Sequence, residues 1–415
     1  MTTSTSSVSD IATFATDHGV DLDWLDDAYI WLHEHPELSG EEEKTAAQLL
    51  EWLDRFDCEV TSGIGGHGIT AVWRNGDGPT VLMRADFDAL PVQETSGIEH
   101  PSTVDGVMHA CGHDMHTTAL LGLCAVMDAR KDAWSGTFIA LFQPAEETTS
   151  GASAMVEDGL GDKIPTPDVC LGQHIVPGRA GKVLSGPGPV MAACDSMTVT
   201  LHGRSAHAST PQNSIDPGYL AAMIVVRLQG IVGREVAPEE FAVVSVGTIS
   251  AGHSNNTIPD TATLVLNCRF YDTEVRDRVY RAIERVIEAE CRASDCPKPA
   301  DIEYWAHGEL TDNDNGVYEH VRPVFDELFG DNSVDATRWA ASEDFPDIPR
   351  HFDVPYLYWM VTVTDPEVWD RAVESDSVAE DVPTNHSGNF APADGTIDVT
   401  VRAAIAGVLS YLWKD

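Results

Sequence analysis

The chain carries very little positive charge. Only six of its 415 residues are lysine, and its 25 basic residues face 67 aspartates and glutamates, which gives a net charge of −42. Nucleic-acid binding depends on neutralising phosphates, so this composition argues against a nucleic-acid partner. Self-repulsion of this strength is relieved when salt shortens the screening length to roughly 3 Å at 1 M. The composition predicts a salt-adapted protein, the alternative being an acidic protein of an ordinary cell.

Long apolar segments are also lacking. No uninterrupted apolar run of 18 residues occurs, and the Ser/Thr-rich start has neither a basic end nor an apolar core. We therefore expect no membrane span, no secretory signal and a cytoplasmic protein. The eight cysteines form no Cys-x-x-Cys pair, so most of them are expected to be reduced core residues, with Cys111 as the exception.

Metal-ligand side chains are concentrated between His109 and His116, where three histidines, a cysteine and an aspartate fall within eight residues. Cys111 and His113 flank a glycine, which lets both side chains face one centre. Thiolate and imidazole suit zinc, while a carboxylate admits harder ions such as manganese. A buried cysteine with a capping histidine, or a cysteine nucleophile with a histidine base, are the alternatives. We predict one wall of a binuclear metal site.

Short apolar strands followed at once by polar residues recur along the chain. Strand 80–84 precedes Asp86 and Asp88, strand 137–142 precedes Glu146 and Glu147, and strand 169–171 precedes His174. Helical patterns lie between them, which favours an open α/β sheet with its ligands beyond the carboxyl ends of the strands. Adjacent carboxylates point in different directions, so one of the Glu146–Glu147 pair can bind a metal while the other acts as a base.

Several other residues are candidates for the metal site only in combination with the residues above. His174 and His386 are single histidines, which more often have a structural role. Asp86 and Asp88 could be metal ligands too, but we predict them as acceptors for ligand imidazoles. Asp114 is expected to lie at the start of the helix that follows His109–His116 and to support the metal ligands without binding the metal itself. We also expect a hairpin at Asn75-Gly-Asp-Gly78 and a disordered start over residues 1–10.

The middle of the chain changes character. Its pattern predicts βαββαβ, the ferredoxin-like arrangement, as an inserted domain over residues 191–308. Residues 1–190 and 309–415 then form the first domain, an open mixed α/β sheet. The expected elements of the insert are strand 196–202, helix 216–234, strands 240–249 and 261–270, helix 273–291 and strand 301–305.

The motifs together resemble the M20 metallopeptidases, and more narrowly their aminoacylase, hippurate hydrolase and auxin-conjugate hydrolase branch. The match runs from about His33 to Phe390. It rests on motifs that follow one another in order: Arg84-Ala-Asp-Phe-Asp-Ala-Leu-Pro91, His109-Ala-Cys-Gly-His-Asp114, Gln143-Pro-Ala-Glu-Glu147, His174, Gly203-Arg-Ser-Ala-His207, Asn256-Thr-Ile-Pro259, Ser342-Glu-Asp-Phe345 and His386.

The resemblance implies a role for each residue. Glu146 would be the general base, His207 of the inserted lid domain would stabilise the oxyanion, and Asn256 and Arg269 would lie near the substrate. The wider family commonly has His-x-Asp where this chain has Asp86-Phe-Asp88, and an acidic bridging ligand in place of Cys111, which leaves the metal open between zinc, manganese and cobalt. Two divalent ions would be held by Cys111, His113, Glu147, His174 and His386.

The implied reaction is hydrolysis of an N-acyl amino acid to a carboxylic acid and an amino acid. A homodimer or homotetramer through the lid domain is implied as well. The alternatives are a carboxypeptidase or dipeptidase, an N-acetyl-diaminopimelate-type deacylase, and a non-catalytic metal-dependent binding protein. Glu146 speaks against the last, because a binding module needs no base beside its ligands.

Overall fold

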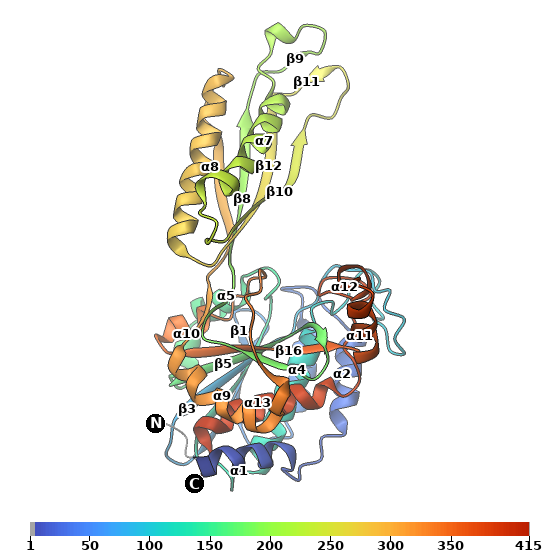
Figure 1. The fold of residues 1–415 in the computed structure, drawn as a ribbon, viewed down its shortest axis with the longest axis vertical. Coiled ribbons are helices and arrows are strands. Elements are labelled where there is room, and N and C mark those ends of the chain that lie inside the picture. The colour runs from blue at the N-terminus through green and yellow to red at the C-terminus, as the bar shows by residue number, and fades with distance from the viewer. Residues whose placement is uncertain (1–4, 415) are drawn as a thin grey trace. The chain divides into compact units, whose positions relative to one another are not determined.

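The computed structural model describes residues 5–414, which divide into two compact units (Figure 1). One unit comprises the chain up to residue 190 together with 312–337 and 344–415, and the other comprises 191–311 and 338–343. The segment 338–343 therefore returns to the second unit after the insert has ended. Among the described residues, no helix is long and apolar enough to cross a membrane.

The first unit is built on a mixed eight-stranded sheet with the order β1-β2-β4-β3-β5-β16-β6-β15. The central strands β4, β3, β5 and β16 run parallel to one another, and β1 and β2 are antiparallel at one edge. This confirms the open mixed sheet. The strands are β1 (Glu59–Ile64), β2 (Gly68–Asn75), β3 (Thr80–Asp86), β4 (Gly136–Gln143), β5 (Val169–Arg179), β6 (Val183–Ser185), β15 (Ser333–Asp335) and β16 (Tyr356–Thr364), while β7 (Gly188–Met191) pairs with β14 (Thr311–Asn313).

The hairpin predicted at Asn75-Gly-Asp-Gly78 is wrong. β4 lies between β2 and β3, antiparallel to the first and parallel to the second. The hairpin of this region instead joins β1 to β2, across the glycine-rich turn at 65–67. Turn chemistry alone could not separate the two, because both loops carry glycines at positive φ.

Helices cover both faces of this sheet. α4 and α13 pack on β3, β4 and β5, whereas α5 and α10 pack on β4 and β5 from the other side, as Figure 1 shows. The helices of this unit are α1 (Thr5–Thr16), α2 (Trp24–Glu34), α3 (Glu43–Leu53), α4 (His113–Ala129), α5 (Gly151–Glu157), α6 (Leu160–Lys163), α9 (Asn315–Phe329), α10 (Asp347–Phe352), α11 (Pro366–Glu374), α12 (Val378–Asp381) and α13 (Thr396–Leu412).

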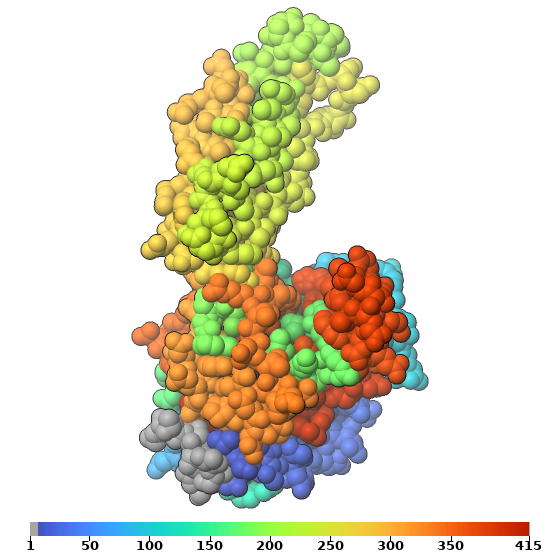
Figure 2. Space-filling model, viewed as in Figure 1, coloured from blue at the N-terminus to red at the C-terminus, as the bar shows by residue number. Residues whose placement is uncertain are grey.

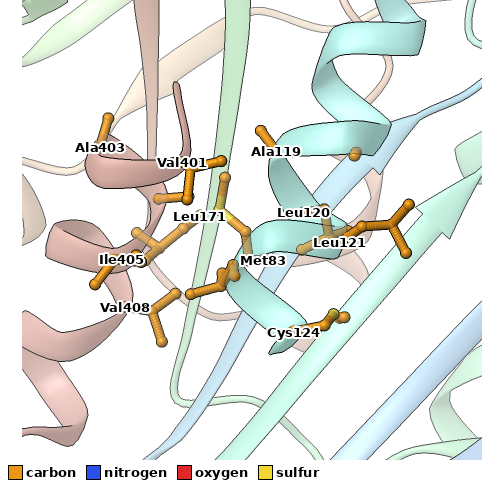
Figure 3. Close-up of a cluster of buried hydrophobic side chains, with 14 of the residues drawn as sticks. Met83, Ala119, Leu120, Leu121, Cys124, Leu171, Val401, Ala403, Ile405 and Val408 are labelled. Carbon is orange, nitrogen blue, oxygen red and sulfur yellow. The ribbon is translucent and has the colours of Figure 1, made fainter. Parts of the chain in front are cut away.

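The centre of the core lies between α4 and α13. Figure 3 shows Leu120 and Cys124 of α4 and Val401 and Ile405 of α13 gathered around Met83 and Leu171 of the central strands. After its first two turns α4 is apolar up to Met127, and its residues from His113 to Met127 are all buried. A helix apolar all round requires such complete burial, so the start of α4 is fixed rigidly against the sheet.

The expected disorder of the chain start is wrong for residues 5–10, since α1 covers residues 5–16; residues 1–4 lie outside the described part. Ile11, Phe14 and Ala15 are buried, and α1 packs against α9 and α13. Phe14 meets the edge of Trp413 with ring centroids 5.2 Å apart. The Ser/Thr-rich composition obscured this apolar stripe.

The second unit has the predicted βαββαβ order. Its four long strands form an antiparallel sheet with the order β10-β12-β8-β13, the ferredoxin-like arrangement, and α7 and α8 pack over one face. The elements are β8 (Ala193–His202), α7 (Pro217–Glu235), β10 (Ala242–Ala251), β12 (Thr261–Phe270), α8 (Thr273–Ala293) and β13 (Asp301–Gly308), with the short pair β9 (Ala206–His207) and β11 (Thr257–Ile258).

The packing of α1 gives a stability prediction. Phe14→Ala should lower the free energy of unfolding by about 3 kcal/mol, because it empties a buried aromatic site beside Trp413. Ser9→Ala, on the exposed side of the same helix, should change it by less than about 0.5 kcal/mol. Denaturant unfolding of the two variants in high salt measures both, and equal midpoints would show that α1 contributes nothing to the core.

Candidate metal centre

Polar side chains collect at the carboxyl edge of the parallel strands. β3 ends at Asp86, and Glu146 and Glu147 follow the end of β4. His174 was expected after a strand, but it lies within β5, which continues to Arg179. The reason is that β5 loses its partner β3 after Gly172 yet stays paired with β16, so His174 lies in a strand with one open side.

The loop before α4 is folded tightly around Gly112. This residue has a φ of +84°, and a Cβ there would lie 2.1 Å from Cδ1 of Ile175. Only glycine satisfies both conditions. Asn385 donates to the carbonyls of Cys111 (3.3 Å) and Ile175 (3.2 Å), and so ties this loop to β5 and to the loop of His386.

Two groups of metal-ligand atoms share Cys111. The first joins Cys111 with His113 and His174, and the second joins it with Glu147 and His386; within each group the ligand atoms lie within 4.8 Å of one another. The Cys111 Sγ is 3.5 Å from His174 Nε2, and His386 Nε2 is 3.3 Å from a Glu147 carboxylate oxygen. The structure thus brings together all five residues that the motifs assigned to metal.

The tautomers of two histidines suit metal binding. His113 Nδ1 is 3.1 Å from the Asp88 carboxylate, and His174 Nδ1 is 2.6 Å from the carbonyl of Ile175. Because each Nδ1 donates its proton to an oxygen, each Nε2 keeps a lone pair directed at the centre. The His113 Nε2 and one oxygen of Glu147 are buried without a hydrogen-bond partner, as expected of atoms meant for an ion.

His116, by contrast, has no free lone pair. Its Nε2 accepts from the backbone of Ile175 at 2.9 Å, and its Nδ1 donates to Asp86 at 2.6 Å. Asp86 also pairs with Arg84, whose guanidinium lies 2.5 Å away. Burial works against the charge of Asp86, but Arg84 and its two histidine neighbours hold its pKa well below the ordinary value. Asp86 therefore orients His116, and Asp88 is the acceptor for the ligand imidazole of His113.

The centre has an excess of negative charge. Burial lowers the pKa of His113, but Asp86 and Asp88 outweigh it and raise that pKa to about 10, while burial and the two glutamates raise the pKa of Cys111. Without a metal, a second proton on His113, at Nε2, would balance the carboxylates around it. A divalent cation would supply the same positive charge, so the donor set and its electrostatics both fit bound metal.

The turn after β4 places two carboxylates differently. Glu147 lies in the second donor group, and its N–H donates to Asp88 at 3.0 Å. Glu146 is buried, and its carboxylate is 3.9 Å from His113 Nε2. The preceding Ala145 has a φ of +52°, which turns the two side chains toward the centre from one short segment.

His386 is the most accessible of the five. Its side chain is 54% exposed, and it lies in the loop that follows α11 and α12. Figure 2 shows this part of the chain, coloured orange-red, standing out from the surface of the first unit. One side of the centre is therefore open to a substrate.

A second buried network lies beside α4. Asp114 accepts from His33 (2.6 Å) and from its own helix at Met115, and His33 also contacts Glu94 at 3.3 Å. Asp114 thus supports the first turn of α4, and its carboxylate is hydrogen-bonded to His33 and Met115 rather than to the five donors. His33, Glu94 and Asn385 were given no role from the sequence, because a buried partner far along the chain leaves no local pattern.

The remaining predicted residues belong to the second unit. His207 and Asn256 lie together on the β9–β11 pair, where Thr257 faces His207, and both are exposed. Arg269 lies on β12, where it donates to Asn267 and Ser342. Since β12 pairs Thr261 with His202 and Arg269 with Cys194, Arg269 is at the opposite end of the sheet from His207.

Comparison with known proteins identifies the family. The model of peptidase family M20/M25/M40 matches residues 82–375. The chain belongs to this family. The match confirms the resemblance read from the motifs, and with it the hydrolase class.

Similar proteins include several amidohydrolases. Hippurate hydrolase of Campylobacter jejuni is 38% identical over 318 residues, which cover 76% of this chain and 82% of that protein. N-acetyl-L-cysteine deacetylase of Bacillus subtilis is 40% identical over 259 residues, 62% of each chain. A solved structure of a dinuclear metal-binding M20 peptidase from Bacillus subtilis is 27% identical, with a TM-score of 0.74 and coverage of 94% of this chain and 98% of that one.

The buried His33 predicts a pH dependence of stability. Burial alone would lower its pKa, but Asp114 and Glu94 raise it to about 9. A raised pKa stabilises the fold fully below the unfolded value of about 6.5, and the effect is lost as the pH rises through 9. Between these limits the wild type should lose on the order of 3 kcal/mol more unfolding free energy than His33→Gln. Denaturant unfolding across this range measures the difference, and parallel pH slopes would contradict it.

Proposed function

We propose that this chain is a metal-dependent amidohydrolase that cleaves N-acyl amino acids into a carboxylic acid and an amino acid. One observation carries the proposal: two groups of metal-ligand atoms share Cys111, and the carboxylate of Glu146 lies beside them without being needed to complete either group. A binding site requires the ligands alone, whereas a hydrolase also requires a base next to them.

The donors would hold two divalent ions. Cys111, His113 and His174 suit one ion, and Cys111, Glu147 and His386 suit the other, with zinc, manganese and cobalt as the candidates. Ions bound there supply Lewis acidity, which lowers the pKa of water and polarises an amide carbonyl. Asp88 maintains the tautomer of His113, and the carbonyl of Ile175 does the same for His174.

The protein's own groups move the proton. Glu146 takes a proton from the attacking water and delivers it to the amide nitrogen that leaves. His207 stabilises the developing oxyanion: its Nδ1 accepts from the backbone of Ser209 at 3.1 Å, so its Nε2 carries the hydrogen that can be donated. Arg269 would hold the substrate carboxylate. Asn256 lies beside His207 at the other end of the sheet and would reach the substrate together with His207.

The relatives support N-acyl amino acids as the substrate class. Besides the hippurate and N-acetylcysteine hydrolases, an IAA-amino acid hydrolase of Arabidopsis thaliana is 33% identical over 80% of this chain. A second candidate, a carboxypeptidase, is favoured by a thermostable carboxypeptidase of Saccharolobus solfataricus that is 37% identical over 65% of this chain. An N-acetyl-diaminopimelate-type deacylase would use the same groups.

The geometry of the second unit supports a homodimer or a dimer of dimers. His207 and Arg269 lie at opposite ends of its sheet, about 26 Å or more apart, since Arg269 is eight steps of ~3.3 Å along β12 from Thr261. A small N-acyl amino acid cannot reach both residues of one copy. We propose that the lid domain, residues 191–308, brings His207 to the site of a second copy.

The amino-acid composition indicates the cellular environment of the protein. A net charge of −42 with only six lysines is sustained most easily where salt screens the surface, so we propose a cytoplasmic enzyme of a salt-rich cell. An activity curve that ignores salt between 0.1 and roughly 3 M would contradict the salt adaptation.

The direct test is a hydrolysis panel in high salt. N-acetyl, N-benzoyl and N-indoleacetyl amino acids and a dipeptide are incubated with the enzyme and added zinc, manganese or cobalt. We expect hydrolysis of N-acyl amino acids, its loss with chelators, and a drop of about 10²- to 10⁴-fold in kcat for Glu146→Gln at unchanged metal content. Chelator resistance combined with inactivation by thiol alkylation would instead support a cysteine nucleophile, and full activity of Glu146→Gln would refute the assigned base.

The dimer proposal predicts complementation between two inactive variants. His207→Ala should lower kcat on the order of 10²-fold while keeping its metal, because one oxyanion donor is lost. After refolding together, Glu146→Gln and His207→Ala should recover about a quarter of wild-type activity, since half of randomly assorted dimers are hybrids with one intact site. No recovery in a verified mixed dimer would show that His207 serves its own chain.

A further inference from the structure

A buried carboxylate that the mechanism does not use lies behind the catalytic turn. Glu42, just before α3, has a fully buried side chain, at 0% exposure. One of its oxygens accepts from the N–H of Gly40 and from the N–H of Ala145, both at 2.9 Å. The other oxygen is buried without a hydrogen-bond partner. Burial raises the pKa of Glu42, so a carboxyl group kept at this position carries an energetic cost.

The hydrogen bond from the Ala145 N–H to Glu42 lies directly before Glu146 in the chain. Ala145 has a φ of +52° and directly precedes Glu146, so its conformation sets the direction in which the Glu146 side chain leaves the backbone. Left-handed conformations are unfavourable for alanine and persist only where surrounding contacts fix them. The carbonyl of Ala145 is also fixed, because it accepts from the N–H of Gly151 at 3.1 Å.

The same arrangement occurs on the other side of Glu146. The N–H of Glu147 donates to Asp88 at 3.0 Å, and the same oxygen of Asp88 accepts from the hydroxyl of Ser39 at 2.7 Å. The N–H groups of both residues that flank Glu146, Ala145 and Glu147, therefore donate to carboxylates. Both carboxylates involve the loop between α2 and α3: Glu42 belongs to this loop, and Asp88 accepts a hydrogen bond from its Ser39.

We propose that Glu42 is a positioning residue for the hydrolysis: by holding the Ala145 N–H it keeps the turn in the conformation that aims Glu146 at the reacting water. This inference rests on the proposed function for its kinetic consequence. Its structural part, that Glu42 rigidifies the turn 143–151, is independent of which substrate the enzyme accepts.

Three variants of the full-length protein test the role. Glu42→Ala removes the acceptor, Glu42→Gln keeps an oxygen at the same place, and Glu37→Ala is the matched control. Glu37 lies in the same loop between α2 and α3 and accepts from the N–H and hydroxyl of Thr45 (2.8 and 2.9 Å) at the start of α3. Its loss therefore disturbs the same helix without removing a bond to the turn.

The readouts are kcat and KM across pH, metal content, and hydrogen exchange of the peptide containing 143–151. We expect Glu42→Ala to lower kcat about 10- to 100-fold with KM and metal content nearly unchanged, since small misplacement of a catalytic group has effects of this size. The Glu146-dependent limb of the pH profile should shift, and exchange of the turn should rise. Glu42→Gln should remain within about threefold of the wild type, by the same reasoning, and Glu37→Ala should retain wild-type kcat.

Several results would overturn the inference. These are unchanged turn exchange in Glu42→Ala, a kcat equal to wild type, loss of metal in parallel with activity, or equal losses in Glu37→Ala. If the wild type hydrolyses no N-acyl amino acid, the proposed function fails while hydrogen exchange still decides the role of Glu42. If the wild type is active and Glu42→Ala is equally active, the inference alone fails.

Discussion

The structure depends on the burial of several carboxylates around one imidazole. Asp86 and Asp88 are almost fully buried, Glu146 and Glu147 reach within 4 Å of His113, and each would be costly if left unpaired. Arg84 and His116 balance Asp86, and His113 balances the rest only by holding a proton. A divalent cation satisfies the same requirement with a larger charge. The charge balance of the site, more than any single ligand, is what makes metal its natural occupant.

The fold brings these charged side chains together through the course of its backbone. Parallel strands deliver their polar ends to one edge, and Gly112 lets the loop before α4 approach β5 closely enough for Cys111 to stand 3.5 Å from His174. The apolar contacts between α4 and α13 hold α4 in place, and with it the loop that leads into α4. Hydrogen bonds from Asn385 join the loop to the segment carrying His386, so three chain segments distant in sequence are held as one unit.

The sequence predicted which side chains lie together better than it predicted the strand pairing. Cys111, His113 and Glu147 are readable because their residue types and spacing have few structural explanations, and the βαββαβ insert is readable because its periodicity changes along the chain. Pairing of β2 with β4 could not be predicted, since an Asn-Gly-Asp-Gly turn favours a hairpin locally and only the sheet as a whole decides against it. Glu42 and Asn385 were missed for a related reason: their roles consist of contacts to backbone atoms about 100 residues or more away.

Salt acts on these two kinds of charge in different ways. Ions in solution screen the exposed acids that give the chain its net charge of −42, but they screen buried pairs such as Arg84–Asp86 far less. The hydrogen bonds that hold the turn at Glu146 are partly buried, so salt screens them less than it screens the exposed acids. Salt therefore changes the free energy of the folded surface and leaves the electrostatics of the centre largely as they are. The salt requirement proposed for this enzyme is then a requirement for folding. Salt affects the catalytic rate only by changing the fraction of protein that is folded.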